Sequence, residues 1–503
     1  MIRRAISLIV HVVAGYVLGD LLAWLILIPI AMVKHLTDAW VGGVASIGGV
    51  LGIVVAFLKW RAGSAPANHW GVHGSAHWAS AAEVRSLVRP DGLIVGRENR
   101  KGGELLRYSG QQHLITIAPT RSGKGVGAII PNLLTADRSV LCIDPKGENV
   151  RAALHARQRF GPVDVLDPFG VTGAPNAAFN PLDGLNEGSP DLVEDAMLLA
   201  DALVYDPPGQ AGEAHWNEEA KALIAGLIMY VVVHENPDIK HLVTVRELLT
   251  GPPDEFGSLL SLMQKSRHGD GLIARAANRH LGKSSREAAG VLSSAQRHTH
   301  FLDSRRMAGV LDHSSFRFED LKAGTCTVFL VLPPDRLSTH SRWLRLLVAQ
   351  AIGALARSTA RPDKPVLLLL DEFAALGRLE PLEQAFGLMA GYGLQLWPIL
   401  QDLHQLWSVY GERAGTFLSN AGLIQVFNVG DVETASWVSK SIGSATMAYQ
   451  TAGASVSKGP GPFFFQQTTT STSTANHLTR RDLLTPDEVM RLDPNLQILL
   501  RQG

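Results

Sequence analysis

The stretch "ITIAPTRSGKGVGAIIPNLL", residues 115–134, lies between apolar runs and holds a glycine-rich turn before a lysine. It approximates the pattern G-x-x-x-x-G-K-[ST], in which backbone N–H groups and the lysine ammonium bind phosphate oxygens. Two positions depart from the pattern, because Ala118 replaces the first glycine and Gly125 replaces the hydroxyl residue. The change at position 125 matters more, since that hydroxyl normally binds Mg²⁺. The stretch alone is compatible with a nucleotide site or with a structural turn.

The sequence around this turn favours the nucleotide site. An apolar strand is predicted over 113–117 and a helix is predicted to begin at Gly125, so the turn has the strand–turn–helix setting that a phosphate loop requires. Most of the binding uses backbone groups, which Ala118 retains if its φ is negative. We expect the phosphates to contact Pro119, Thr120, Arg121, Ser122, Gly123, Lys124, Gly125 and Val126.

A second segment, "PVLLLLDEFAALG" at 365–377, places Asp371 and Glu372 at the end of an apolar strand. A phosphate-loop enzyme needs an acidic Mg²⁺ partner and a general base at this position. We therefore predict that Asp371 supports Mg²⁺ through water and that Glu372 polarises the attacking water. An acidic helix cap would explain Asp371 alone but not the whole arrangement. The next strand ends in "LQLWPILQD", whose Gln401 is either a phosphate sensor or a helix cap.

The order of apolar runs predicts an α/β protein with a doubly wound sheet. The runs are near-continuous rather than alternating, as expected for parallel strands covered on both faces. The predicted strands are 113–117, 139–143, 163–166, 325–332, 366–370, 394–400 and 423–428. Between 183 and 320 strand signals are scarce, which indicates an inserted helical domain. Its run 222–233 is too short to span a bilayer and is predicted to be a buried core helix.

Composition limits the class of protein. The 503 residues carry 46 basic and 46 acidic side chains, so the formal net charge is +0. A dedicated duplex binder normally has a basic excess, and any nucleic-acid contact here must be local. The two cysteines, Cys142 and Cys326, lie far apart in apolar runs, which indicates no disulfide and favours a reduced compartment.

The amino-terminal 61 residues are predicted to form a transmembrane hairpin. The runs 5–33 and 39–58 are each long enough for a spanning helix, which needs about 20 apolar residues. A cleaved signal peptide is the alternative, although its apolar core should be shorter. Basic residues before the first run and after the second predict that both ends are cytoplasmic.

Two further segments flank the predicted body. In the linker 62–105, His69, His73 and His77 are four residues apart, but Gly71 and Gly74 disfavour the helix that would align them as metal ligands. Near the carboxyl end, the Ser/Thr-rich stretch "FFFQQTTTSTSTANHLTRRD" at 463–482 is predicted to be a mobile loop.

Several motifs together resemble one known family. They are, in chain order, "HGSAHWAS", "APTRSGKGVG", "CIDPKGE", "FNPL", "HWNEEAKALIAGLI", "LLLLDEFAALGRL", "ILQDLHQLWSVYG" and "LLTPDEVMRL". With the amino-terminal hairpin they resemble the type IV secretion coupling proteins, the TraG-type family of membrane ATPases. In that family a glycine after the loop lysine is ordinary, so Gly125 need not mark a decayed site.

The resemblance implies a RecA-like ATPase domain over 106–182 and 319–503, with an all-alpha domain over 183–318 that engages cargo. It implies a homo-hexamer in the bacterial inner membrane, multi-pass, with the bulk of the chain cytoplasmic. ATP and Mg²⁺ would be bound, and the partners would be type IV channel components, membrane lipid, and either relaxase-bound single-stranded DNA or protein effectors. The resemblance favours Gln401 as a sensor and suggests an arginine supplied by a neighbouring subunit, with Arg378, Arg413 and Arg480 as candidates.

Two other functions remain open on the sequence. One is a membrane receptor whose nucleotide binding gates docking without sustained hydrolysis, which the missing hydroxyl and the neutral charge make credible. The other is an FtsK-like DNA translocase, which usually carries more membrane spans and a DNA-reading domain at its carboxyl end.

Overall fold

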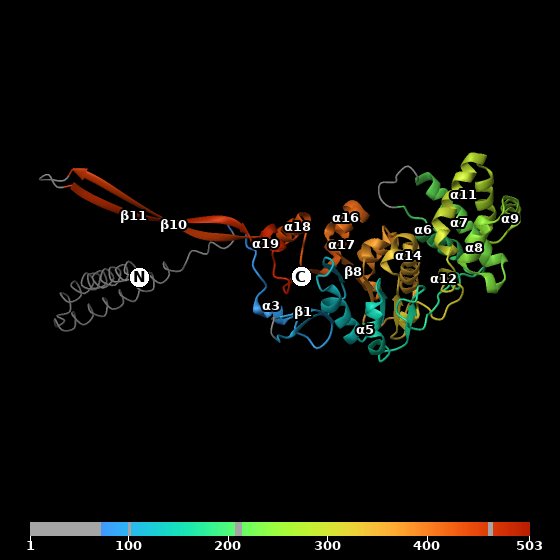
Figure 1. Cartoon of the computed structure of the whole chain (residues 1–503), viewed down its shortest axis with the longest axis horizontal. Helices are drawn as coiled ribbons and strands as arrows, with labels where there is room; N and C mark the ends of the chain where they lie inside the picture. Colours follow the sequence, from blue (N-terminus) through green and yellow to red (C-terminus); the bar gives the residue numbers. More distant parts are fainter. Residues whose placement is uncertain (1–71, 99–101, 207–213, 461–465, 503) are drawn as a thin grey trace, which may run out of the picture. The chain divides into compact units, whose positions relative to one another are not determined.

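The computed structural model describes residues 72–98, 102–206, 214–460 and 466–502 (Figure 1). The described residues divide into two compact units, a larger one within 77–442 and 482–502 and a smaller one within 72–76 and 443–481. The predicted transmembrane hairpin lies outside the described residues. Among the residues that are described, no helix is both long and apolar enough to cross a bilayer.

The larger unit is built on an eight-stranded sheet with the order β12-β9-β3-β8-β7-β4-β6-β5. Its strands are β3 His113–Ile117, β4 Val140–Ile143, β5 Val163–Leu166, β6 Thr327–Leu330, β7 Val366–Leu370, β8 Leu394–Leu400, β9 Ala421–Val426 and β12 Ile498–Arg501. All neighbouring strands are parallel except β12, which pairs antiparallel with β9. The seven strands expected from the apolar runs are therefore confirmed, and the sheet is mixed only at its β12 edge.

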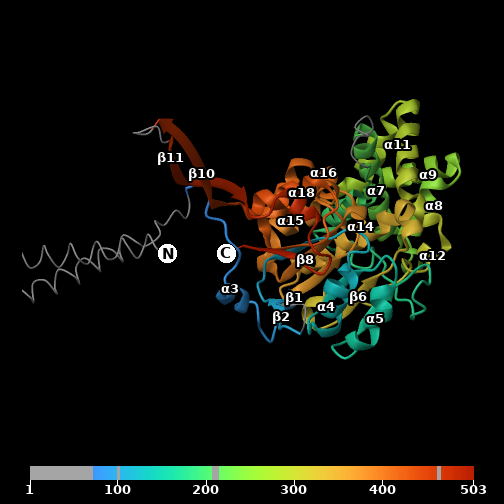
Figure 2. The same cartoon turned by 60° about the vertical axis from the view of Figure 1, so that its left-hand side comes forward.

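Side chains of the central strands enter two separate cores, one on each face of the sheet. On β4, Leu141 and Ile143 belong to one cluster, while Val140 and Cys142 belong to the other. The second cluster also contains residues of α4 (Ile130–Thr135) and α5 (Glu148–Arg157), and the first contains residues of α14 (Pro334–Arg357). Figure 2 shows α4 and α5 on one side of the strands and α14 on the other. Cover on both faces explains why β4 and β7 are apolar at every position and the other central strands at most positions.

Apart from the helices between β5 and β6, the remaining helices and strands of the larger unit are short. They are α3 Ala81–Arg85, β1 Leu93–Arg97, β2 Leu105–Tyr108, α15 Glu380–Leu388, α16 Leu403–Tyr410, α17 Ala414–Asn420, α18 Val432–Ile442 and α19 Pro486–Met490. Strands β1 and β2 pair antiparallel as a separate two-stranded sheet. Cys142 and Cys326 are buried free thiols, as predicted.

Between β5 and β6 the described chain forms helices and no strand. The helices are α6 Leu192–Leu203, α7 Ala214–His234, α8 Leu242–Thr250, α9 Pro253–Lys265, α10 Leu272–Leu281, α11 Ser285–Thr299, α12 Arg305–Ala308 and α13 Asp320–Ala323. In Figure 1, α7, α8, α9 and α11 lie together in green and yellow. The apolar run 222–233 lies within α7, where most side chains are buried, so the predicted core helix is confirmed. Helix α6 packs against both α7 and α14, and it therefore connects this helical segment to the sheet.

One prediction is wrong, because the described part of the Ser/Thr-rich stretch, residues 466–482, is a strand and not a loop. Strand β11 (Gln466–Asp482) pairs with β10 (Ser444–Pro460). The hydroxyl groups of Ser455 and Ser471 are 2.7 Å apart, and His477 Nε2 lies 3.0 Å from Thr451 Oγ1. Threonine is β-branched and favours strands, so a run of threonines next to a pairing partner extends rather than turns.

Candidate functional site

The turn between β3 and the following helix is shaped to hold an anion. Arg121 and Gly123 have φ of 63° and 89°, and the Ser122 N–H and hydroxyl donate to the Pro119 carbonyl at 3.2 and 2.6 Å. The N–H groups of Arg121 and Gly123 donate to no acceptor in the described part of the chain. Left-handed residues near a helix start, with N–H groups left unpaired, form an anion-binding concavity.

Ala118 is accommodated because its backbone does not need glycine. Its φ is not positive, its side chain is fully buried, and its N–H donates to the Leu400 carbonyl at 2.8 Å. The entrance of the turn is therefore fixed by the neighbouring strand β8. The departure from glycine at this position leaves the loop geometry intact, in accord with the sequence prediction.

The helix after the turn opens with a π-helical segment, Gly125–Ile129, in which Ile130 N–H donates to the Gly125 carbonyl. Pro131 explains the wider turn, because a proline ring clashes with the carbonyl four residues before it and lacks an N–H. At Gly125 an added Cβ would meet no atom within 4 Å. The packing therefore leaves room for a side chain where the pattern usually has serine or threonine.

Lys124 meets both predicted carboxylates. Its Nζ lies 2.8 Å from Asp371 Oδ1 and 3.2 Å from Glu372 Oε1. Gln401 Nε2 donates to Glu372 Oε2 at 3.1 Å. Because β8 lies between β3 and β7 in a parallel sheet, these side chains come from three neighbouring strand ends. The structure thus brings together Lys124, Asp371, Glu372 and Gln401, which the sequence nominated separately.

Burial and neighbouring charges shift the pKa values of both Lys124 and Asp371. Burial raises the pKa of Asp371 above its usual value, and Lys124 opposes that shift. Burial lowers the pKa of Lys124, but the charges and hydrogen bonds of Asp371 and then Glu372 outweigh it, so the net shift is upward. Lys124 is therefore held protonated between the two carboxylates.

Glu372 adopts a strained backbone conformation, with φ 51° and ψ 43°. A left-handed conformation at a residue other than glycine costs about 1–3 kcal/mol and is typical of functional turns. Glu372 N–H donates to Asp371 Oδ1 at 3.0 Å, and a 3₁₀ turn, η6 (Phe373–Leu376), follows with Phe373 buried in the core. The strand end, the hydrogen bond and the buried phenyl ring together hold Glu372 in this conformation.

Asp402 and two of the candidate arginines, Arg378 and Arg413, make their contacts outside this cluster. Asp402 caps α16 by accepting from Gln405 N–H at 2.8 Å, so the capping role belongs to Asp402 and not to Gln401. Arg378 and Arg413 are about half exposed and both pair with Glu383 on α15. Arg480 lies in β11 of the smaller unit. Within the described residues, neither Arg378 nor Arg413 bonds to Lys124, Asp371 or Glu372.

Asp144 is a further carboxylate of this edge that the sequence analysis did not assign. It follows β4, whose Ile143 pairs with Leu370 of β7, so Asp144 and Asp371 leave neighbouring strands at the same level. Asp144 is only 1 % exposed and accepts from Val150 N–H at 2.9 Å. Burial raises the pKa of its carboxyl to about 6, and the charge of Asp371 adds to the shift. The signal was present in "VLCIDPKGE", which ends an apolar strand in a carboxylate as "LLLLDEF" does.

The cluster suits Mg²⁺ only as part of a nucleotide complex. Among the residues described, no group of three His, Cys, Asp or Glu side chains could hold a metal. Mg²⁺ commonly takes one or two carboxylates, waters and substrate phosphates rather than a full protein cage. Asp371 and Glu372 meet that requirement by oxygen chemistry and position. The predicted linker histidines do not form a metal site within the described part, and His69 lies outside it.

Comparison with known proteins gives a consistent result. Residues 77–503 match the family described as "Type IV secretory system Conjugative DNA transfer". The chain is 30% identical to a conjugal transfer protein TraG of Escherichia coli over 501 residues, covering 90% of this chain and 75% of that one. It is 29% identical to protein VirD4 of Agrobacterium fabrum (strain C58 / ATCC 33970), covering 86% of this chain and 64% of the relative.

Among solved structures, the fold is similar to the bacterial conjugative coupling protein TrwB in its unbound form. The TM-score is 0.61 at 18% identity, covering 85% of this chain and 90% of that one. A TrwB complex with ADP and Mg²⁺ gives a TM-score of 0.60 at 17% identity, covering 85% and 91%. At this identity the similarity establishes an α/β fold of the same kind.

We predict that Asp144→Asn stabilises the protein more at pH 7.5 than at pH 4.5. A carboxyl whose pKa rises on folding, here from 3.8 to about 6, destabilises the folded state progressively as pH rises between those values. The change in free energy of unfolding caused by the substitution should therefore be more favourable by about 1–2 kcal/mol at pH 7.5. Urea unfolding at both pH values measures it.

The matched control is Asp137→Asn, because Lys364 lowers the pKa of the exposed Asp137 carboxyl. Its effect should be small and of opposite sign, a loss of stability that fades as the pH falls. A pH-independent effect of Asp144→Asn would show that this carboxyl is not held in the unfavourable environment described.

Proposed function

The chain belongs to the type IV secretory system conjugative DNA transfer family, and we propose that it is the ATPase that couples cargo to a type IV secretion channel. The observation that carries the proposal is the meeting of Lys124, Asp371, Glu372 and Gln401 at three adjacent strand ends. An ammonium, two carboxylates and a carboxamide beside an anion-binding turn are the groups that hydrolysis of a nucleotide phosphoanhydride needs.

In the proposed reaction each residue has a distinct task. The turn 119–126 binds the phosphates of ATP through its N–H groups, and Lys124 carries positive charge to the terminal phosphate oxygens. Glu372, held by the amide of Gln401, orients the attacking water and accepts its proton. Mg²⁺, when bound, supplies further positive charge to the phosphates, and Asp371 would hold it through water, since Gly125 provides no hydroxyl.

Nucleotide binding would exchange the partners of Lys124. In the structure its ammonium is bound by two carboxylates, whereas phosphate oxygens would draw it toward the turn. Asp371 and Glu372 would then lose their neutralising cation, and their combined negative charge favours a divalent cation in return. The related TrwB has been solved with a non-hydrolysable ATP analogue and with ADP and Mg²⁺, which supports the same ligands here.

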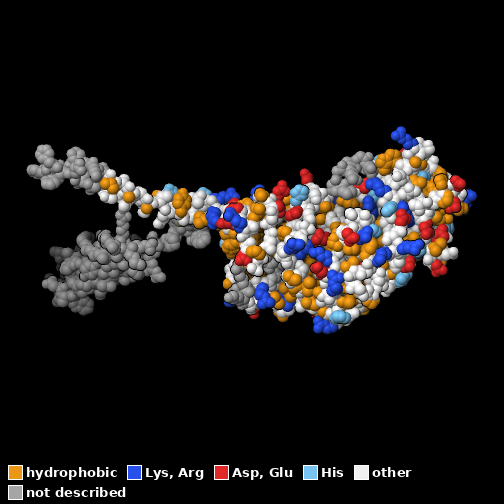
Figure 3. Space-filling view, in the orientation of Figure 1, with side chains coloured by type: hydrophobic (Ala, Val, Ile, Leu, Met, Phe, Trp, Pro, Cys, Tyr) orange, Lys and Arg blue, Asp and Glu red, His pale blue; other side chains and the backbone are white. Residues whose placement is uncertain are grey.

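We further propose a membrane-anchored hexamer that receives relaxase-bound single-stranded DNA or protein effectors and moves them by ATP turnover. Family membership supports the DNA cargo. Figure 3 shows Lys and Arg interspersed with Asp and Glu over the visible face of the larger unit, which agrees with local nucleic-acid contacts. The helical segment 183–318 would engage cargo, the run 5–58 would anchor the chain in the inner membrane, and Arg378, Arg413 or Arg480 would reach a neighbouring site.

A docking receptor without sustained hydrolysis is the second candidate. It is favoured by Gly125, which lacks the usual Mg²⁺ hydroxyl, and by the ion pairs that occupy the ammonium of Lys124. In that case nucleotide would change the conformation of the chain without being consumed. The variants below distinguish the two functions.

Lys124→Ala should lower the rate of ATP hydrolysis by about 100-fold or more, because it removes the cation that stabilises charge on the transferred phosphoryl group. Phosphate release by the purified full chain measures the effect. Lys364→Ala is the control, since that lysine pairs with Asp137 on the surface. Hydrolysis at the wild-type rate in Lys124→Ala would refute the assignment of the site.

Glu372→Gln keeps the size of the side chain but removes its charge and one of the two oxygens that accept from Lys124 and Gln401. We expect affinity for a non-hydrolysable ATP analogue to stay within about threefold while hydrolysis falls by about 100-fold or more. DNA transfer from donor cells should then be lost, whereas the exposed Glu433→Gln should transfer normally. If transfer survives without hydrolysis, the receptor is correct and the motor is not.

Gly125→Ser should lower the Mg²⁺ concentration needed for half-maximal hydrolysis by about threefold or more, because it adds a hydroxyl ligand. The site has room for the side chain, since an added Cβ meets no atom within 4 Å. Gly125→Ala fills the same space without the hydroxyl and should leave the Mg²⁺ dependence unchanged. Equal Mg²⁺ dependence in both variants would show that a hydroxyl at position 125 does not bind the ion.

A further inference from the structure

Arg345 on α14 is a buried cation without a carboxylate partner among the described residues. Its side chain is 3 % exposed, and its guanidinium donates to the carbonyls of Ala202, Leu376 and Arg378. Burying an unpaired charge is unfavourable, so the three carbonyls and the packing around them must compensate. A buried charge with such specific partners indicates a role in holding those partners together.

The carbonyls belong to two segments that are distant in the sequence. Ala202 lies in the last turn of α6, at the beginning of the helical segment, where carbonyls lack helical partners and carry the negative end of the helix dipole. Leu376 ends the 3₁₀ turn η6, which begins directly after Glu372. One guanidinium therefore caps α6 and the turn that follows the proposed catalytic carboxylate.

Tyr205 adds an aromatic contact to the same connection. The guanidinium carbon of Arg345 lies 4.1 Å from the centroid of the Tyr205 ring, which is a close cation–π contact. The ring also lies against Gly377, where an added Cβ would be 2.4 Å from Tyr205 Cζ. Gly377 has φ +60° and leaves no space for a side chain. The turn after Glu372 and the end of α6 are thus in direct contact.

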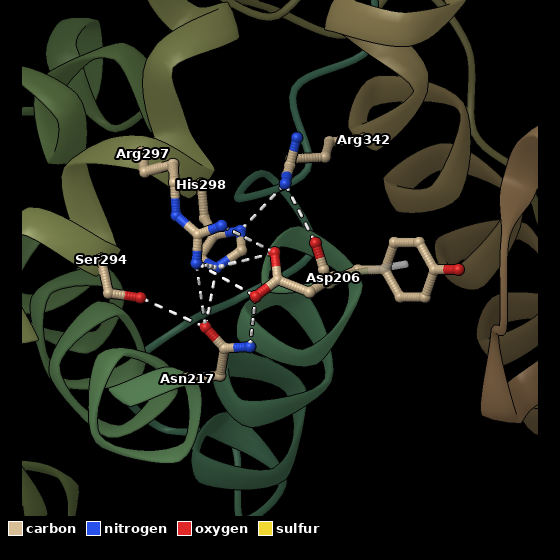
Figure 4. A network of polar contacts seen from close by, with 7 residues as sticks. Asp206, Asn217, Ser294, Arg297, His298 and Arg342 are labelled. Atoms are coloured by element: carbon tan, nitrogen blue, oxygen red, sulfur yellow. Dashed lines mark hydrogen bonds and ion pairs between the residues drawn. The ribbon is translucent and has the colours of Figure 1, made fainter. Parts of the chain in front are cut away.

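The segment that carries Tyr205 is also bound by side chains of α14 and α11. Arg342, three residues before Arg345 on α14, donates to the Tyr205 carbonyl at 2.9 Å and approaches His298 Nδ1 at 3.0 Å. The carboxylate of Asp206 accepts two hydrogen bonds from the guanidinium of Arg297, at 2.8 and 3.0 Å (Figure 4). A movement of the α6 end would therefore be transmitted to α11, which carries Arg297 and His298.

The same contacts reach Glu372 through a short stretch of chain. Ala375 N–H donates to the Glu372 carbonyl at 2.8 Å and Gly377 N–H donates to the Ala374 carbonyl at 3.0 Å, so the turn is one hydrogen-bonded unit. Phe373 is buried in the core at its beginning. A change at Glu372 on nucleotide binding would shift the carbonyls of Leu376 and Arg378 that Arg345 binds.

We propose that Arg345, with the ring of Tyr205, is a positioning residue that couples the Glu372 turn to the helical segment at the end of α6. The coupling rests on the proposed nucleotide site. Arg345 touches neither phosphate nor water in this role; it acts by making the turn and the α6 end move together, because separating them would leave a buried guanidinium without acceptors.

Hydrogen exchange of the full chain tests the coupling. In the wild type, a non-hydrolysable ATP analogue with Mg²⁺ should change the exchange rate of amides 198–206 by about fivefold or more. Arg345→Lys and Tyr205→Leu should abolish this change while the affinity for the analogue stays within about twofold. Tyr205→Phe is the matched control and should respond as the wild type, because it keeps the ring that Arg345 contacts. Thermal unfolding shows whether each variant folds. If Arg345→Lys does not fold, the result for Tyr205→Leu alone tests the coupling.

Kinetics provide an independent readout. The coupling variants should lower kcat for ATP by about fivefold or more with KM within about twofold, as expected for a residue that positions Glu372 without touching substrate. A wild type that binds the analogue without any change at 198–206, or a Tyr205→Leu variant that responds normally, overturns the coupling alone. A wild type that binds no analogue overturns the proposed function, and the coupling falls with it.

Discussion

Parallel pairing of the central strands is the constraint on which the site depends. In a parallel sheet every carboxyl end lies at the same edge, so residues that are far apart in the chain become neighbours if each directly follows a strand. Lys124, Asp371 and Gln401 follow or adjoin β3, β7 and β8 in this way. The strand order β3-β8-β7 then determines which of them meet, and it places Gln401 where it bonds Glu372.

The charged side chains of the molecule are compensated in different ways. The charges at the carboxyl ends of the strands are partly buried, and each has a partner. Lys124 pairs with Asp371 and Glu372, and Asp144 accepts from the Val150 N–H. Arg345 on α14 has carbonyls and an aromatic ring as its partners instead of a carboxylate. Separating this buried cation from either of the helix ends that it binds costs free energy, and the inferred coupling follows from that cost.

The predictions that failed or were incomplete share a physical cause. The Ser/Thr-rich stretch was predicted to be a loop because hydroxyl residues accompany turns, but pairing with β10 outweighed that local tendency. Asp144 was overlooked because "DPKGE" has a turn-like composition, and only the register of β4 with β7 places it beside Asp371. The role of Arg345 was invisible, since an arginine within an amphipathic helix gives no indication that it is buried.

The sequence by itself determined the fold class, seven strands and the position of the glycine-rich turn after β3, because periodicity and turn chemistry are local properties of the chain. The pairing of Gln401 with Glu372, the cap role of Asp402 and the contact of Tyr205 with Gly377 were decided only by the tertiary structure. They depend on strand order and on which helix ends meet. Those relations arise only when the strands pair into the sheet and helices cover both of its faces.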